Sequence, residues 1–288
     1  MAATEIRSVG IVGLGTMGAG IAEVCARAGA QTIACDVSDE AVGRGRAAFS
    51  RSLARGVERG KIDAHASERA HELLTTSTVL SALADVDLVI EAAVEEIEMK
   101  RQLFEELDRV AERAAVLATN TSALSVTEIA AATARPERVV GMHFFNPAPV
   151  LPLVEIIRTD LTAEHAFDSA YGFAHTVGKQ PIACRDTPGF VVNRILVPVL
   201  NDAVRVFDEG TASAEDIDRA MELGTSWPIG PLSLIDLIGI DVHVHVSEVL
   251  WGAYREARYA PPPRLVRMME AGHLGRKSGR GFFEYATP

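Results

Sequence analysis

One histidine and one glutamate, twelve residues apart, are the side chains in this sequence best suited to acid–base chemistry. His143 and Glu155 flank a segment that contains Pro147, Pro149 and Pro152. Proline lacks a backbone donor and fixes its own φ, so this segment is expected to form a rigid turn and neither a helix nor an interior strand. Two strands joined by such a turn would place the imidazole beside the carboxylate, as in a general base held by an orienting acid. A core histidine next to a proline turn explains the same residues equally well.

The composition limits the classes of protein to which the chain can belong. It has 288 residues, 48% hydrophobic and 23% charged, with a formal net charge of -11. This length predicts one large or two medium domains. The negative charge argues against nucleic acid as a partner and gives no attraction to anionic lipid. No apolar run approaches the roughly 20 residues that span a bilayer. Three cysteines without C-x-x-C spacing, and an N-terminus with no room for a signal peptide, predict reduced thiols in a cytoplasmic protein and no metal site.

A glycine-rich loop follows the first predicted strand and precedes a helix. Gly13, Gly15 and Gly18 form the pattern G-x-G-x-x-G. In this context they allow a tight turn, a close approach of a pyrophosphate to the backbone, and packing of the helix on the strand. A second strand, residues 31–36, ends at Asp36, close to the spacing of about 20 residues expected for a carboxylate that accepts ribose hydroxyls. These elements predict a dinucleotide site. Asp36 would repel a 2′-phosphate, so NAD is favoured over NADP.

Several other polar residues each allow two interpretations. A helix predicted over residues 39–60 has a basic edge that includes Arg55 and Arg59. This edge is either a solvated face or a binding site for a phosphorylated substrate tail. Ser122 follows a predicted strand and is either a turn residue or a hydroxyl that faces a ligand. Asn193 interrupts an apolar helix and is either bonded to backbone or directed into a cleft.

The pattern of elements divides the chain into two predicted domains. Alternating strands and helices over residues 1–186 predict a Rossmann-type doubly wound, mostly parallel sheet. Residues 187–288 have helical patterns, so the second domain is expected to be all-helical, and its first helix is predicted to have Thr187 as its N-cap and Pro188 at its first position. We expect the functional site in the cleft between these domains. The apolar C-terminal helices predict a homodimer.

Taken in order, these motifs resemble those of the L-3-hydroxyacyl-CoA dehydrogenase family, especially its short-chain bacterial 3-hydroxybutyryl-CoA members. The resemblance covers essentially the full chain and depends on several blocks together. They are the loop of residues 13–18, Leu88-Val-Ile-Glu-Ala, Ala118-Thr-Asn-Thr-Ser, His143-Phe-Phe-Asn-Pro, Thr187-Pro-Gly-Phe-Val-Val-Asn-Arg, Gly230-Pro-Leu and Gly275-Arg-Lys-Ser-Gly-Arg-Gly-Phe.

The resemblance implies an NAD-dependent oxidoreductase that interconverts (S)-3-hydroxyacyl-CoA and 3-ketoacyl-CoA. In this family His143 would take the 3-hydroxyl proton, Glu155 would fix its tautomer, and Ser122 and Asn193 would bond the substrate oxygen and align the acyl group. The implied cofactor contacts are Gly13, Gly15, Thr16, Met17, Gly18, Asp36, Glu95, Lys100, Asn120, Ser122, Asn146 and Lys277. The implied substrate contacts, mostly to coenzyme A, are Ser52, Arg55, Arg59, Ser122 and Asn193.

Two departures from the family pattern bear on the substrate. Arg59 stands where many members have lysine, and it binds phosphate with a different geometry. Trp227 adds bulk where a His-Pro-Met run is common, which leaves the acyl-chain length open. An alternative is the same chemistry on acyl groups carried by an acyl carrier protein in a biosynthetic pathway. A nucleotide-binding protein without catalysis is a third interpretation, which the joint presence of the four catalytic candidates opposes.

Overall fold

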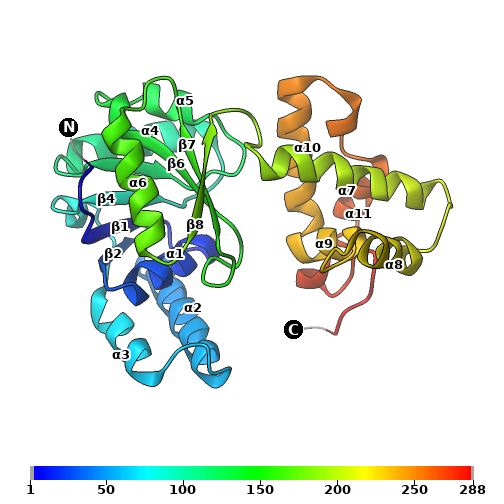
Figure 1. Cartoon of the computed structure of the whole chain (residues 1–288), viewed down its shortest axis with the longest axis horizontal. Coiled ribbons are helices and arrows are strands. Elements are labelled where there is room, and N and C mark those ends of the chain that lie inside the picture. The colour runs from blue at the N-terminus through cyan, green and yellow to red at the C-terminus, as the bar shows by residue number, and fades with distance from the viewer. Residues whose placement is uncertain (1–2, 287–288) are drawn as a thin grey trace. The chain divides into compact units, whose positions relative to one another are not determined.

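A computed structural model describes residues 3–286, and the chain divides into two compact units whose boundary in the sequence lies between Thr187 and Pro188. Figure 1 shows the first unit in blue to green and the second in yellow-green to red. The strands of the described chain are β1 (Ser8–Val12), β2 (Gln31–Cys35), β3 (Leu74–Ser77), β4 (Leu88–Glu91), β5 (Val116–Thr119), β6 (Val139–Phe144), β7 (Leu153–Arg158) and β8 (Gln180–Arg185). The α-helices are α1 (Thr16–Arg27), α2 (Asp39–Glu58), α3 (Ala64–Leu73), α4 (Ile97–Val110), α5 (Val126–Ala131), α6 (Glu164–Thr176), α7 (Val192–Asp208), α8 (Ala214–Thr225), α9 (Pro231–Ile238), α10 (Ile240–Tyr254) and α11 (Pro263–Glu270).

All the strands belong to one sheet in the first unit, with the order β3-β2-β1-β4-β5-β6-β7-β8. The strands from β3 to β6 are parallel, β7 runs antiparallel to β6, and β8 is parallel to β7. The chain moves outward from β1 to β3 and then returns to the other side of β1, which is the topological switch of a dinucleotide-binding sheet. The predicted doubly wound, mostly parallel sheet is confirmed.

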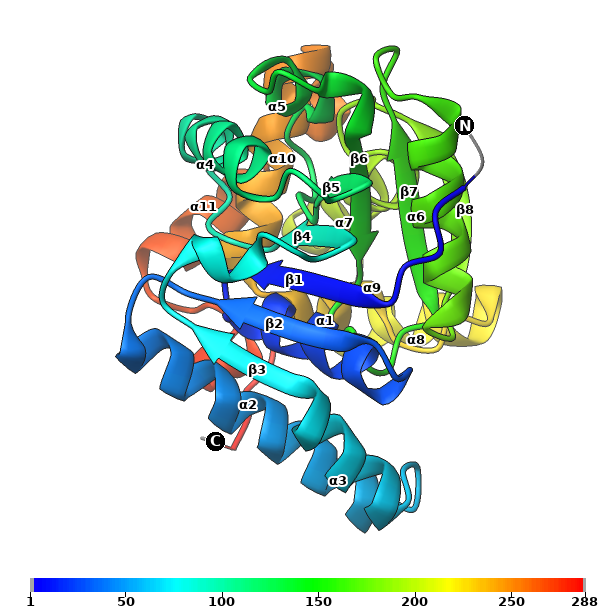
Figure 2. The same ribbon diagram turned by 90° about the vertical axis from the view of Figure 1, so that its left-hand side faces the viewer.

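Helices cover both faces of this sheet, so its central strands are apolar throughout. One core cluster joins residues of α1, α2 and α6 to the sheet, while α4 and α5 lie on the opposite face (Figure 2). Every residue of β4, β5 and β6 is buried. Strands covered on both faces are near-continuous hydrophobic runs. A polar side chain within them therefore needs a partner, a condition that applies to Glu91, Thr119, His143 and, on β7, Glu155.

The second unit is all-helical, as predicted, and packs around a core that includes Leu200, Leu232 and Ile240. Its first helix does not begin where the sequence prediction placed it. Thr187 is not an N-cap and Pro188 is not helical, because α7 starts at Val192. Gly189 and Phe190 have φ of 75° and 49°, and this left-handed backbone cannot continue a right-handed helix. Within the described residues, no helix is both long and apolar enough to cross a membrane.

Helix α3 and strand β3 of the first unit were not predicted. Helix α3 has Ala70 as its buried residue, so its apolar periodicity is weak. Strand β3 is a short edge strand with the sequence LTTS, which lacks an alternating apolar face. Both follow α2, and β3 joins the sheet by pairing with β2.

A buried histidine makes the stability of the helical unit sensitive to pH. His243 Nε2 lies 2.9 Å from Asn201 Oδ1, and burial lowers the pKa of His243 to about 4. The unfolded imidazole titrates near 6.5, so the unfolded chain binds more protons between these two values. The contribution of His243 to stability is therefore complete above pH 6.5 and is lost as the pH falls toward 4. We expect the free energy of unfolding to drop by about 2 kcal/mol from pH 7 to pH 5 through this residue.

Tryptophan fluorescence measures this effect directly, because Trp227 and Trp251, the two tryptophans of the chain, both lie in the helical unit. Urea unfolding at the two pH values should show the loss in the wild type. The variant His243→Gln keeps a polar side chain but does not titrate, so its stability should depend less on pH. An equal pH dependence in the variant and the wild type would contradict the assignment.

Candidate active site

Strands β6 and β7 place His143 directly opposite Glu155. The two residues are paired in the antiparallel register, and His143 Nδ1 lies 2.7 Å from Glu155 Oε2. Glu155 is fully buried and His143 is 6% exposed. A carboxylate only accepts hydrogen bonds, so Nδ1 is the protonated nitrogen of the neutral ring and Nε2 is the basic one. The pair that the spacing predicted is present.

The proline-rich segment between these strands is a turn, as predicted. It contains a cis peptide bond between Asn146 and Pro147. The ammonium of Lys179, which is buried, donates to the carbonyls of Ala148 at 2.5 Å and Leu151 at 2.8 Å. The turn is thus tied to the body of the sheet, while Asn146 at its start is exposed.

The loop after β5 lies beside the histidine strand. Asn120 Oδ1 accepts a hydrogen bond from the backbone N–H of Phe144, the neighbour of His143, at 2.9 Å. Glu95 Oε1 accepts from the Thr121 hydroxyl at 2.6 Å, and from the Ser122 N–H and hydroxyl at 2.8 and 3.2 Å. Burial alone would raise the pKa of Glu95, but the Lys100 ammonium and these hydrogen bonds together lower it. Glu95 is therefore an ionised acceptor that holds Ser122.

Sequence reasoning missed one member of this region, Glu91. It ends β4, is fully buried, and accepts a hydrogen bond from Lys100 Nζ at 2.6 Å. Lys100 Nζ also lies 3.4 Å from Glu95 Oε2, and Lys100 is 1% exposed. The structure thus brings together Glu95 and Lys100, both predicted as cofactor contacts. An acid at the carboxyl end of an apolar parallel strand was the signal that could have found Glu91.

The glycine loop has the shape that a pyrophosphate requires. Gly13 has φ of 89°, and a Cβ on Gly18 would lie 1.7 Å from the Gly13 carbonyl oxygen. A Cβ on Gly15 would meet no atom within 4 Å, so the backbone there faces open space. Gly15 caps α1 without a side-chain hydrogen bond, and the first helical residues are Thr16 and Met17. The first turn of α1 therefore presents N–H groups suited to a phosphate.

Asp36 lies just beyond β2 and braces the same loop. Its Oδ2 accepts the N–H of Leu14 at 2.7 Å, and its Oδ1 accepts the N–H of Val37 at 2.7 Å. These hydrogen bonds fix the carboxylate at the end of β2, next to the glycine loop. This donor and acceptor set fits a dinucleotide whose ribose hydroxyls reach Asp36.

The remaining predicted residues lie on α2 and in the second unit. Ser52 and Arg55 are on α2 and Arg59 is its C-cap; neither arginine forms an ion pair with another described residue. Asn193 is in the first turn of α7, in the second unit. Lys277 also belongs to that unit, where its Nζ donates to Asp241 Oδ2 at 2.6 Å. Among residues 3–286, no group of three or more His, Cys, Asp and Glu side chains is placed to hold a metal ion.

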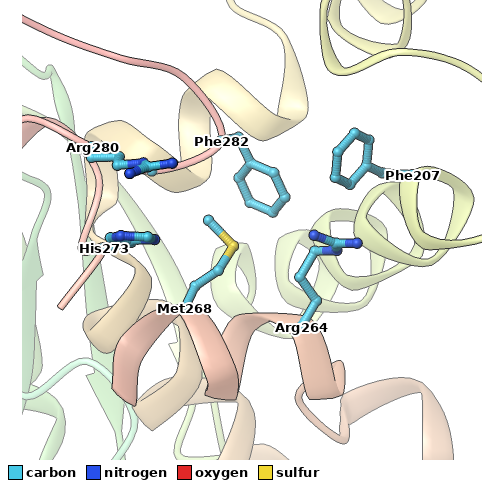
Figure 3. A pocket seen from close by; sticks show the side chains of 7 residues that line it. Phe207, Arg264, Met268, His273, Arg280 and Phe282 are labelled. Carbon is cyan, nitrogen blue, oxygen red and sulfur yellow. The ribbon is translucent and has the colours of Figure 1, made fainter. Parts of the chain in front are cut away.

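Two hollows in the molecule involve other residues. A cavity of about 470 Å³ in the first unit is lined in part by Arg27, Lys61 and Lys179. A smaller one of about 190 Å³ lies in the helical unit, where Met268 of α11 and Phe282 of the C-terminal segment point toward each other (Figure 3). Neither is lined by the dyad or by Ser122, so the site is defined by its hydrogen-bonded groups.

Comparisons with known proteins identify the family of this chain. Residues 8–187 match the 3-hydroxyacyl-CoA dehydrogenase NAD binding domain, and residues 189–285 match the C-terminal domain of the same family. A 3-hydroxybutyryl-CoA dehydrogenase of Mycobacterium tuberculosis is 49% identical over 97% of this chain and 99% of its own length. The crystal structure of M. tuberculosis FadB2 is similar with a TM-score of 0.96 at 48% identity, over 98% of this chain and all of that one. The (S)-3-hydroxybutyryl-CoA dehydrogenase PaaH1 of Ralstonia eutropha is similar with a TM-score of 0.92 at 43% identity, again over 98% of this chain and all of that one. The chain therefore belongs to the 3-hydroxyacyl-CoA dehydrogenase family.

Proposed function

We propose that this chain interconverts (S)-3-hydroxyacyl-CoA and 3-ketoacyl-CoA with NAD, acting on short acyl groups such as 3-hydroxybutyryl and acetoacetyl. The observation that carries the proposal is the buried hydrogen bond between His143 and Glu155, in a sheet that also holds the glycine loop. The names of the relatives from M. tuberculosis and R. eutropha support the short acyl chain.

The chemistry follows from the tautomer of His143. Its Nε2 accepts the proton of the substrate 3-hydroxyl during oxidation and returns it during reduction. Glu155 keeps the proton of the neutral ring on Nδ1 and stabilises the imidazolium. NAD, when bound, supplies the hydride acceptor. The glycine loop holds its pyrophosphate, and the carboxylate of Asp36 accepts from its ribose and disfavours NADP.

Further contacts are proposed from the family resemblance. Ser122 and Asn193 bond the substrate oxygen and align the acyl group. Glu95, Lys100, Asn120, Asn146 and Lys277 contact NAD. Ser52, Arg55 and Arg59 contact coenzyme A, and the two exposed guanidiniums on α2 suit its phosphates.

Turnover of acetoacetyl-CoA by the purified protein tests this function. The absorbance of NADH should fall when acetoacetyl-CoA is added, and NADPH should be a much poorer reductant. Longer 3-ketoacyl-CoA substrates define the acyl preference. If the wild type reduces none of these thioesters, the proposal fails. Comparing kcat/KM for the same acyl group on coenzyme A and on acyl carrier protein decides between the coenzyme A substrate and the alternative in which an acyl carrier protein carries the acyl group.

The homodimer is proposed on the exposed apolar face of α7. Ile195 is 64% exposed, and Val199 and Val206 are each 36% exposed. Their spacing puts them along one side of the helix, which is the pattern of an interface. We expect a dimer by size-exclusion chromatography with light scattering, and a monomer for Ile195→Asp, because a carboxylate would be desolvated in the interface. Val79→Asp, at an exposed valine of the first unit, should leave the mass unchanged. A wild type that is monomeric at micromolar concentration would contradict the prediction.

A further inference from the structure

A network of charged side chains, buried at Glu91 and Lys100 and partly exposed at Glu95, connects β4 to Ser122. We propose that Glu91 is a positioning residue of the dehydrogenase reaction and acts on Ser122 through Lys100 and Glu95. The inference rests on the proposed function, in which Ser122 contacts the substrate oxygen. Glu91 itself is expected to touch neither the substrate nor the cofactor.

Glu91 is the fixed end of this network. It is fully buried, and both of its carboxylate oxygens accept hydrogen bonds. Oε1 accepts from the backbone N–H of Ala93 at 2.7 Å and from Lys100 Nζ at 2.6 Å. Oε2 accepts from the hydroxyl of Thr119, on β5, at 2.7 Å. Because these partners come from strand ends and from α4, the carboxylate has little freedom to move.

Lys100 connects Glu91 to Glu95. Its ammonium contacts Glu91 Oε1 at 2.6 Å and Glu95 Oε2 at 3.4 Å, and the side chain is 1% exposed. Replacing buried ion pairs by apolar side chains of similar volume is often neutral or stabilising in proteins. Stability is therefore a weak reason for three charged groups at this position, whereas they do fix the geometry of what they contact.

Glu95 is the end of the network that faces the site. One atom, Oε1, accepts from the Thr121 hydroxyl at 2.6 Å and from the Ser122 N–H and hydroxyl at 2.8 and 3.2 Å. The other oxygen faces Lys100. If the ammonium loses Glu91, it is drawn toward Glu95 and the carboxylate shifts. Because Oε1 holds both the backbone and the hydroxyl of Ser122, that shift displaces the hydroxyl, and small displacements in a site have large kinetic effects.

The variant Glu91→Gln tests the role of this network, and its kinetics are measured with acetoacetyl-CoA at saturating NADH. We expect kcat about tenfold below the wild type, with the KM for acetoacetyl-CoA changed by less than about threefold. The loss should be non-additive with Ser122→Ala: in that background Glu91→Gln should lower kcat by less than about twofold, because the group it positions is gone. The matched control is Glu23→Gln on α1, another buried glutamate, which pairs with Arg27 outside the site. It should leave kcat unchanged.

Lys100→Met is the second variant and is decisive if Glu91→Gln does not fold. Removing the ammonium takes away an interaction that keeps Glu95 ionised. The fall of kcat on the acid side should therefore begin at higher pH than in the wild type, which loss of packing alone would not produce. Three results overturn the proposal: an unchanged kcat in Glu91→Gln, full additivity with Ser122→Ala, or an unshifted acid limb in Lys100→Met. If the wild type itself shows no turnover, the proposed function fails first, and this is seen before any variant is compared.

Discussion

Replacing His143 by alanine is expected to lower kcat for acetoacetyl-CoA reduction by about a thousandfold, within the range of positioned general acid–base catalysis. In the proposed reaction the imidazolium donates the proton of Nε2 in that direction, and the hydrogen bond from Nδ1 to Glu155 orients the ring. Alanine has no group that can take over this transfer. The substitution removes a ring that is 6% exposed, so the fold should survive with reduced stability.

Steady-state kinetics of NADH oxidation measure this loss, and NADH binding followed by fluorescence shows whether the cofactor site is intact. The affinity for NADH should change little, because the glycine loop and Asp36 are unaltered. His175→Ala, at an exposed histidine on α6, is the control and should keep wild-type activity. If His143→Ala keeps more than about a tenth of the wild-type kcat, His143 does not perform the proton transfer.

Replacing Glu155 by glutamine is expected to lower kcat by about a hundredfold or more while the fold stays intact. The amide has nearly the same shape, so it can occupy the same position on β7 beside His143. It carries no charge to stabilise the imidazolium. Its NH₂ group can also donate to Nδ1, which would favour the tautomer with the proton on Nε2. That tautomer cannot accept the substrate proton during oxidation, and during reduction it could donate its Nε2 proton only by becoming an imidazolate.

The kinetics should separate this orienting effect from binding. The KM for acetoacetyl-CoA should change far less than kcat, because Glu155 is buried behind the imidazole. Glu164→Gln provides a matched control, since that glutamate pairs with Arg158 at the surface and is 71% exposed. It should be as active as the wild type. Wild-type kcat in Glu155→Gln would show that the hydrogen bond to His143 has no role in catalysis.

Much of the fold was predictable because its signals are local. The turn at Gly13 and the contact of Gly18 with the Gly13 carbonyl each need glycine at one position, and the backbone at Gly15 between them is open. The apolar runs of β4, β5 and β6 predict strands that are covered on both faces. Local signals failed at the start of α7, where the prediction relied on Thr187 and Pro188 and did not foresee the left-handed backbone at Phe190.

By itself, the sequence determined the dinucleotide-binding sheet, the helical second unit and the residue types of an acid–base pair. The side-chain network required the tertiary structure. His143 faces Glu155 because β7 runs antiparallel to β6 in one register, and a shift by one residue would turn the pair to opposite faces. Glu91, Lys100 and Glu95 come from β4, α4 and the loop between them, and their partners Thr119 and Ser122 come from β5 and the loop after it. Hydrogen bonds between separate elements depend on how the elements pack, which spacing along the chain does not encode.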